Sequence, residues 1–145
     1  MTLAGPAPLT VLADTGALYA LVDRDDAWHR RVVAWWRRAK EEVLVPMAVL
    51  PEISYLLHTR LGARAELAFL RAVVSGEFTV EPLFPEDVAR SADIMAIYAD
   101  TPLGFVDASL AASAERLAVV NILTTDRRHF SLIRPQHVSS FRLLP

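Results

Sequence analysis

Cysteine is absent from this 145-residue sequence. The chain therefore has no disulfide framework, thiolate metal site or cysteine nucleophile, and a bound metal ion would need oxygen or imidazole ligands. Lysine is nearly absent, since Lys40 is the only one, and the formal net charge is −2. A protein that coats nucleic acid carries a broad basic surface, which this chain lacks. Any such contact must be local, at Arg60 with Arg64 or Arg127 with Arg128, unless these are solvated helix ends.

A leader peptide and a membrane span are also missing from the pattern. Residues 1–10 carry no basic region, and the apolar stretch 9–22 is interrupted by Asp14 and Gly16. We expect a cytoplasmic protein with one domain over 1–145 and a core over about 9–143. The hydrophobic share of 53% is high for a soluble monomer, so we also expect an oligomer or a dedicated partner.

Short apolar runs alternate with segments of helical periodicity along the chain. This alternation predicts an α/β fold with three layers, in which a doubly wound, mainly parallel sheet carries helices on both faces. The expected strands are 9–13, 42–45, 78–81, 119–123 and 138–143. The expected helices are 15–22, 26–41, 47–60 or 51–60, 63–75, 86–99 and 105–117, with a short irregular or helical link at 127–133.

Four acidic residues stand in or directly after apolar sequence. Asp14 and Asp126 each close a predicted strand, whereas Glu52 and Asp107 lie within apolar helical segments. Ligands of an open parallel sheet bind beyond the carboxyl ends of its strands, so these acids meet if the first and fourth strands are neighbours. Clustered carboxylates repel one another unless one is protonated or a cation is bound. The sequence therefore predicts an acidic, metal-dependent site.

Carboxylate ligands favour Mg²⁺ or Mn²⁺, and the matching reaction is hydrolysis of a phosphodiester bond. We expect Asp14 and Asp107 to bind the ion directly, and Asp126 to bind it directly or through water. Glu52 would position or deprotonate the attacking water. Thr15 and Thr125 would orient carboxylates or contact phosphate, unless they serve turns and caps.

Each acid also has a structural alternative. Asp14 and Asp107 could cap helices, and Asp126 could start the turn that follows it. Asp93 and Asp100 are weaker candidates, for which we expect a solvated or capping role. The four histidines show no paired spacing for zinc, and we expect surface or structural roles for all of them: His29, His58, His129 and His137.

Four motifs in this order resemble the PIN domain, specifically the VapC-like toxin ribonucleases of bacterial toxin–antitoxin pairs. The resemblance covers about 9–143, nearly the whole chain, and its last two motifs are the most specific. The motifs are Leu12-Ala13-Asp14-Thr15-Gly16-Ala17-Leu18, Pro51-Glu52-Ile53, Phe105-Val106-Asp107-Ala108-Ser109-Leu110-Ala111 and Thr124-Thr125-Asp126-Arg127-Arg128-His129-Phe130.

The resemblance implies a doubly wound sheet, Mg²⁺- or Mn²⁺-dependent endonuclease activity on RNA, and inhibition by a small VapB-like antitoxin. Its acidic quartet matches Asp14, Glu52, Asp107 and Asp126. Members often carry a further acid where this chain has Gly104, which leaves one metal ion or two open. Relatives commonly form homodimers. The helix expected at 26–41, with its three tryptophans, is a candidate partner surface unless it packs into the core.

Two other functions fit part of the pattern. A phosphoryl-transfer protein of the haloacid-dehalogenase or receiver type would use Asp14 as nucleophile, but usually needs a second acid close by and a late lysine. Here Thr15-Gly16-Ala17 follows, and Lys40 stands alone. A PIN-like binding module without activity is the second alternative, although it would have no reason to tolerate the repulsion of four acids.

Overall fold

The computed structural model describes residues 9–145. Residues 1–8, which make up most of the segment where we expected no leader, lie outside the described part. The described chain forms a five-stranded sheet of order β3-β2-β1-β4-β5, in which every strand pair is parallel. The predicted α/β fold is confirmed. The strands are β1 (Thr10–Ala13), β2 (Glu42–Pro46), β3 (Thr79–Glu81), β4 (Asn121–Leu123) and β5 (Arg142–Leu144).

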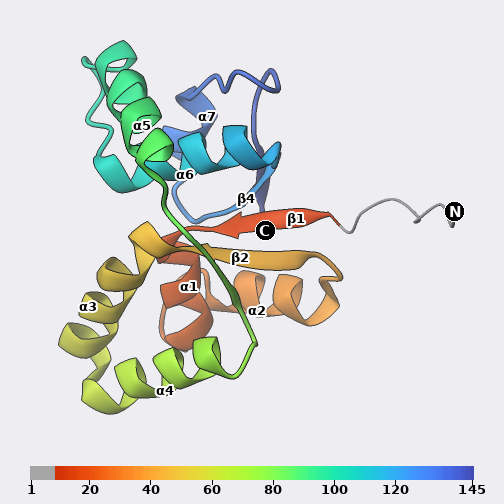
Figure 1. The fold of residues 1–145 in the computed structure, drawn as a ribbon. Helices are drawn as coiled ribbons and strands as arrows, with labels where there is room; N and C mark the ends of the chain where they lie inside the picture. The colour runs from red at the N-terminus through yellow and green to blue at the C-terminus, as the bar shows by residue number, and fades with distance from the viewer. Residues whose placement is uncertain (1–8) are drawn as a thin grey trace, which may run out of the picture.

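Helices flank the sheet on both sides. In Figure 1, α1 to α4 lie below strands β1 and β2, and α5 to α7 lie above them. The first group is α1 (Thr15–Val22), α2 (His29–Arg38), the short 3₁₀ turn η1 (Met47–Val49), α3 (Leu50–Leu61) and α4 (Ala63–Val74). The second group is α5 (Pro85–Ile97), α6 (Phe105–Leu117) and α7 (Arg127–Leu132).

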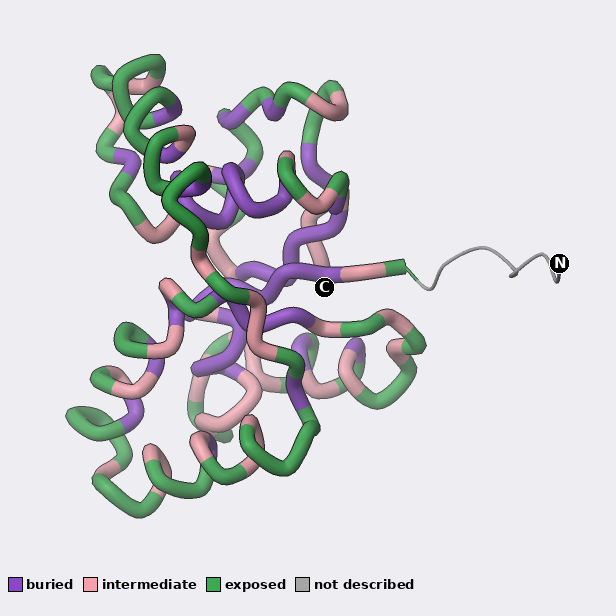
Figure 2. The backbone as a smooth tube through the Cα atoms, in the orientation of Figure 1, coloured by how far each residue is buried: buried purple, intermediate pink, exposed green. Residues whose placement is uncertain are grey.

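The central strand β1 lies between β2 and β4, and it is buried on both of its faces. Leu12 pairs with Leu44 of β2 and with Ile122 of β4. Val11, Leu12 and Ala13 have no exposed surface, as the buried central strands in Figure 2 illustrate. A strand covered on both faces needs the continuous apolar run seen here. Because β1 and β4 are parallel neighbours, the residues that follow them meet at one edge of the sheet.

Helix α2 begins later than the expected residue 26. The carboxylate of Asp26 accepts a hydrogen bond of 2.8 Å from the backbone N–H of Trp28, so Asp26 forms a local turn and Trp28 precedes the helix. Trp35 is buried, and the Trp36 ring lies 5.2 Å from that of Phe78. Core packing thus accounts for two of the three tryptophans. Among the described residues, no helix combines the length and apolar character needed to span a membrane.

Candidate active site

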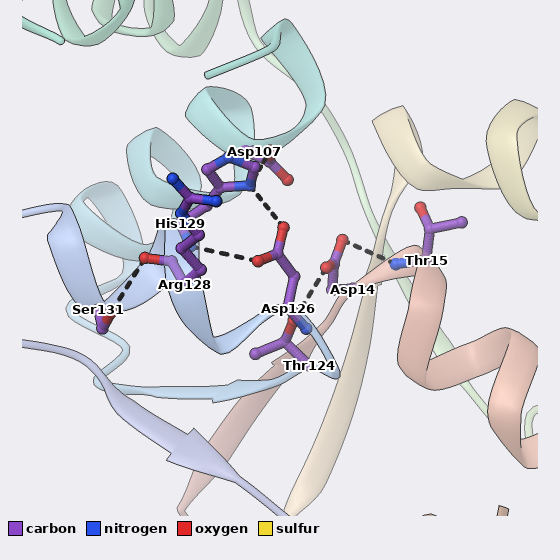
Figure 3. Close-up of polar contacts among 8 residues, drawn as sticks. All are labelled: Asp14, Thr15, Asp107, Thr124, Asp126, Arg128, His129 and Ser131. Atoms are coloured by element: carbon purple, nitrogen blue, oxygen red, sulfur yellow. Dashed lines mark hydrogen bonds and ion pairs between the residues drawn. The ribbon is translucent and has the colours of Figure 1, made fainter. Parts of the chain in front are cut away.

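Asp14 lies where β1 ends and α1 begins, and it caps α1. Its Oδ1 accepts a 2.8 Å hydrogen bond from the backbone N–H of Thr15, and its Oδ2 accepts a 3.0 Å bond from the hydroxyl of Thr124 (Figure 3). The backbone N–H of Asp14 donates to the carbonyl oxygen of Leu123, at 2.9 Å. Hydrogen bonds from α1 and from the end of β4 therefore fix Asp14, and only 6% of its surface is exposed.

Asp126 is linked to Asp14 through one side chain. The Thr124 hydroxyl that donates to Asp14 also accepts a 2.9 Å hydrogen bond from the backbone N–H of Asp126. Asp126 in turn caps α7, because its Oδ1 accepts from the backbone N–H of His129 at 3.2 Å. Capping and membership of the acidic cluster are thus compatible for both acids. Of the two adjacent threonines, it is Thr124 that makes these bonds; Thr125, for which we considered a carboxylate, phosphate or turn role, does not take part in them.

Asp107 completes a close group from the first turn of α6. His129 Nδ1 lies 2.6 Å from Asp126 Oδ2 and 3.8 Å from Asp107 Oδ2. One potential ligand atom from each of Asp107, Asp126 and His129 falls within 4.8 Å of the others. The expectation that His129 has only a surface or structural role missed this placement. The available signal was its spacing from Asp126, since residues three apart on a helix share a face.

Glu52 lies in the first turn of α3 and is exposed. Its negative charge raises the pKa of both Asp14 and Asp107, so it belongs to the same electrostatic environment. Asp93 and Asp100 are exposed, on α5 and in the turn after it, and they join no group of potential metal ligands in residues 9–145. The structure thus places Asp107, Asp126 and His129 close together. Asp14 is linked to Asp126 through Thr124 and feels the charge of Asp107, and Glu52 lies at the border.

The carboxyl groups of Asp14 and Asp107 hold protons more strongly than usual. Burial, and next the charge of Asp107, raise the pKa of Asp14 to about 7, against hydrogen bonds from Thr15 and Thr124 that lower it. Burial and the charge of Asp126 raise the pKa of Asp107 to about 6, partly offset by His129. A divalent cation would remove this repulsion and stabilise the ionised carboxylates. The donor set of carboxylates and one imidazole fits such an ion.

An unsatisfied hydroxyl beside Asp14 also fits a bound group. Thr15 is 4% exposed, and its buried Oγ1 has no hydrogen-bond partner in the described chain. Such orphan groups are rare and call for a water, ion or ligand oxygen. The next residue, Gly16, packs closely against the loop after β4: a Cβ added there would lie only 2.5 Å from Thr125 Oγ1. Glycine is therefore what lets the Thr125 loop pack against the start of α1.

The PIN domain family model matches residues 11–134, which include all four acids. The chain belongs to the PIN-domain family. This PIN domain is 33% identical over 135 residues to Ribonuclease VapC26 of Mycobacterium tuberculosis, which covers 93% of this chain and 100% of that protein. Membership in this family argues against the haloacid-dehalogenase and receiver alternative.

Solved structures share the fold of this PIN domain. VapC20 of M. tuberculosis, described as a sarcin-ricin-loop-cleaving toxin, superposes with a TM-score of 0.73 at 24% identity, over 77% of this chain and 86% of that one. A toxin–antitoxin complex from Klebsiella pneumoniae gives a TM-score of 0.66 at 18% identity, over 85% and 92%. DNA-bound VapBC from Salmonella typhimurium gives 0.67 at 18% identity, over 93% and 96%.

Proposed function

We propose that this VapC-like PIN domain is a metal-dependent endoribonuclease that serves as the toxin of a toxin–antitoxin pair. The observation that carries this proposal is the acidic cluster beyond β1 and β4. Asp107 and Asp126 lie close together with His129, and the pKa values of Asp14 and Asp107 are raised toward neutrality. The 33% sequence identity to Ribonuclease VapC26, which spans the whole length of that protein, supports RNA cleavage as the reaction. The cleavage is hydrolysis, in which water attacks phosphorus and one P–O bond of the RNA backbone breaks.

We assign the ion to Asp14, Asp107 and Asp126, with Glu52 at the edge of the site, and we propose Mg²⁺ or Mn²⁺ because oxygen ligands dominate. When bound, the ion supplies a water of lowered pKa, orientation of the phosphate and neutralisation of the leaving oxygen. Thr124 and His129 keep Asp14 and Asp126 in place through the hydrogen bonds described above.

Glu52 is proposed as the group that positions the attacking water or takes its proton. It is exposed at the start of α3, near enough to Asp14 and Asp107 to raise their pKa values. An exposed carboxylate retains the mobility and access to water that this role needs. The orphan hydroxyl of Thr15 offers a further donor to a water or a phosphate oxygen.

We propose RNA as the substrate, a VapB-like antitoxin as the inhibitor, a homodimer as the assembly and the cytoplasm as the place of action. Apolar side chains exposed on α3 and α4 support the proposal that an antitoxin or a second copy of the chain covers this surface. Tyr55, Leu61, Leu67 and Val74 are 67%, 41%, 49% and 88% exposed. The toxin–antitoxin assembly of structural relatives supports an antitoxin partner.

Cleavage of defined tRNA and rRNA fragments by antitoxin-free protein tests the proposal. We expect discrete products with Mg²⁺ or Mn²⁺ and none with EDTA. The cleavage rate should fall at least about 100-fold for Asp107→Asn. Asp93→Asn is the matched control, because it removes an exposed carboxylate from α5, outside the cluster. Equal cleavage by wild type and Asp107→Asn, or cleavage that persists in EDTA, would refute the nuclease site. Folded, metal-binding protein that cleaves none of these fragments would point to a different RNA target. Asn variants at Asp14 or Asp107 that leave both fold stability and cellular toxicity unchanged would favour the inactive binding module.

A further inference from the structure

Trp28 carries two arginine side chains over its ring. The central guanidinium carbon of Arg31 lies 4.6 Å from the ring centroid, and that of Arg127 lies 5.6 Å from it. Trp28 is half-buried in the turn before α2, whereas both arginines are exposed. Arg31 comes from α2 and Arg127 from the start of α7, so the ring joins two distant parts of the chain. This arrangement fixes two positive charges close together.

The two guanidinium groups keep hydrogen-bond donors available. Arg127 donates a 2.6 Å hydrogen bond to the backbone oxygen of Pro145, which fixes the position of this guanidinium group and uses one of its N–H donors. Within residues 9–145, neither Arg31 nor Arg127 forms an ion pair with an Asp or Glu side chain. Stacking on an aromatic ring uses the flat face of a guanidinium group and leaves its N–H edge free to bind phosphate oxygens.

One arginine of this pair comes from the residue next to the acidic site. Arg127 directly follows Asp126, a proposed metal ligand, and its side chain contacts the ring of Trp28. RNA approaching the acids meets a cluster of negative charge on a protein whose net charge is −2. A local pair of cations is the feature that would offset this repulsion and hold the strand.

We propose that Arg31 and Arg127, ordered by Trp28, bind backbone phosphates of the RNA strand that flank the cleaved bond. This inference rests on the proposed ribonuclease function and adds a substrate-binding element to it. Single-stranded RNA is the expected ligand, since its splayed backbone can place neighbouring phosphates on two fixed guanidinium groups.

The test measures binding of a fluorescent single-stranded oligoribonucleotide in EDTA, where cleavage is suppressed, over a series of salt concentrations. For Arg31→Gln with Arg127→Gln we expect binding at least about tenfold weaker at low salt, and a salt slope smaller by about 1.4, at about 0.7 per phosphate contact. Arg31→Gln alone, which leaves the bond to Pro145 intact, should lower the slope by about half as much.

Trp28 variants separate ordering of the arginines from their charge. Trp28→Leu should weaken binding about two- to fivefold, the value of an exposed cation–π contact, with an unchanged salt slope. Trp28→Phe retains a ring and should bind nearly as well as wild type. Arg71→Gln is the control, because Arg71 is exposed on α4 and belongs to no ion pair within the described chain.

The outcomes distinguish this inference from the function on which it rests. A salt slope for both arginine variants equal to that of Arg71→Gln, while wild type still cleaves RNA, would overturn the inference alone. An acidic protein segment would then be the better-fitting ligand of the pair. Wild-type protein that neither binds nor cleaves RNA would overturn both.

Discussion

The hydroxyl of Thr124 donates a 3.0 Å hydrogen bond to Asp14 Oδ2, across 110 residues of sequence. The same oxygen accepts from the backbone N–H of Asp126, so one buried side chain fixes two acids that follow different strands. Metal ligands depend on such hydrogen-bonded neighbours for their orientation. Thr124 is thus a structural link between the two ends of the site.

Thr124→Val should damage the site while preserving side-chain shape. It would leave a carboxylate oxygen and a backbone N–H without their partner, at a cost of about 1–3 kcal/mol in the free energy of unfolding. We also expect metal affinity to fall about 10- to 100-fold. Denaturant unfolding and a Mn²⁺ titration measure the two effects. Thr124→Ser retains the hydroxyl and should stay near wild type; an equal loss in both variants would contradict the assignment.

Gly16→Ala should strain the contact between α1 and the loop after β4. The new Cβ would lie 2.5 Å from Thr125 Oγ1, too close for any unshifted arrangement. We expect a loss of about 1–3 kcal/mol in unfolding free energy, as in other overpacked sites. Thr125→Ala removes the clashing oxygen, so the double variant should recover most of this loss. Strictly additive effects in the double-mutant cycle would show that the two residues do not crowd each other.

His129 should stabilise the metal site through Asp126. His129→Phe removes the 2.6 Å contact with Asp126 Oδ2, and we expect Mn²⁺ affinity to fall about tenfold. His129→Asn, whose amide nitrogen can replace Nδ1, should retain more of the affinity. His58→Phe is the control, since the His58 side chain is 58% exposed and lies on α3. If His129→Phe bound Mn²⁺ as tightly as wild type, His129 would have no role in the metal site.

The metal-free protein should lose stability as the pH rises toward neutrality. The pKa of Asp14 is about 7 in the folded protein against an ordinary value of 3.8, so the folded state binds more protons than the unfolded chain between these values. The stability that protonation of Asp14 contributes to the folded state is complete below its ordinary pKa and is lost as the pH rises through about 7. Asp107, with a pKa of about 6, adds a loss of the same sign.

Thermal unfolding in EDTA between pH 5 and pH 8 measures this effect against Asp14→Asn, which cannot ionise. At pH 8 we expect the variant to unfold several degrees above wild type, with a smaller difference at pH 5, since about 1 kcal/mol corresponds to about 2–4 °C at this size. Mn²⁺ should raise the wild-type midpoint most at pH 8. Parallel pH profiles for the two proteins would refute the raised pKa.

The sequence predicted the fold well because strong local signals agreed with it. Helix α6 spans Phe105–Leu117 as expected, but β4 begins at Asn121 rather than at 119. Ala118 takes a left-handed conformation, and the N–H of Val119 bonds back to Ala114, so these residues end the helix instead of starting the strand. Such capping depends on backbone geometry that the apolar run 119–123 does not reveal.

The sequence allowed the acidic site residues to be predicted for a physical reason, but not the side chains that hydrogen-bond to them. Asp14 and Asp126 follow parallel strands, and the carboxyl ends of neighbouring parallel strands share one edge. Which of Thr124 and Thr125 turns toward Asp14 depends on the local twist after β4. The contact of His129 with Asp107 depends on how α7 packs against α6. Both are tertiary relationships that sequence spacing leaves open.

The central claim is that Asp14, Glu52, Asp107 and Asp126 create one divalent-ion site, and a Mn²⁺ titration followed by electron paramagnetic resonance tests it most directly. Wild type and Asp93→Asn should bind the ion with equal affinity, whereas Asp14→Asn and Asp107→Asn should each bind at least about tenfold more weakly while remaining folded. Equal binding by all four proteins, or no binding by wild type, would contradict the account.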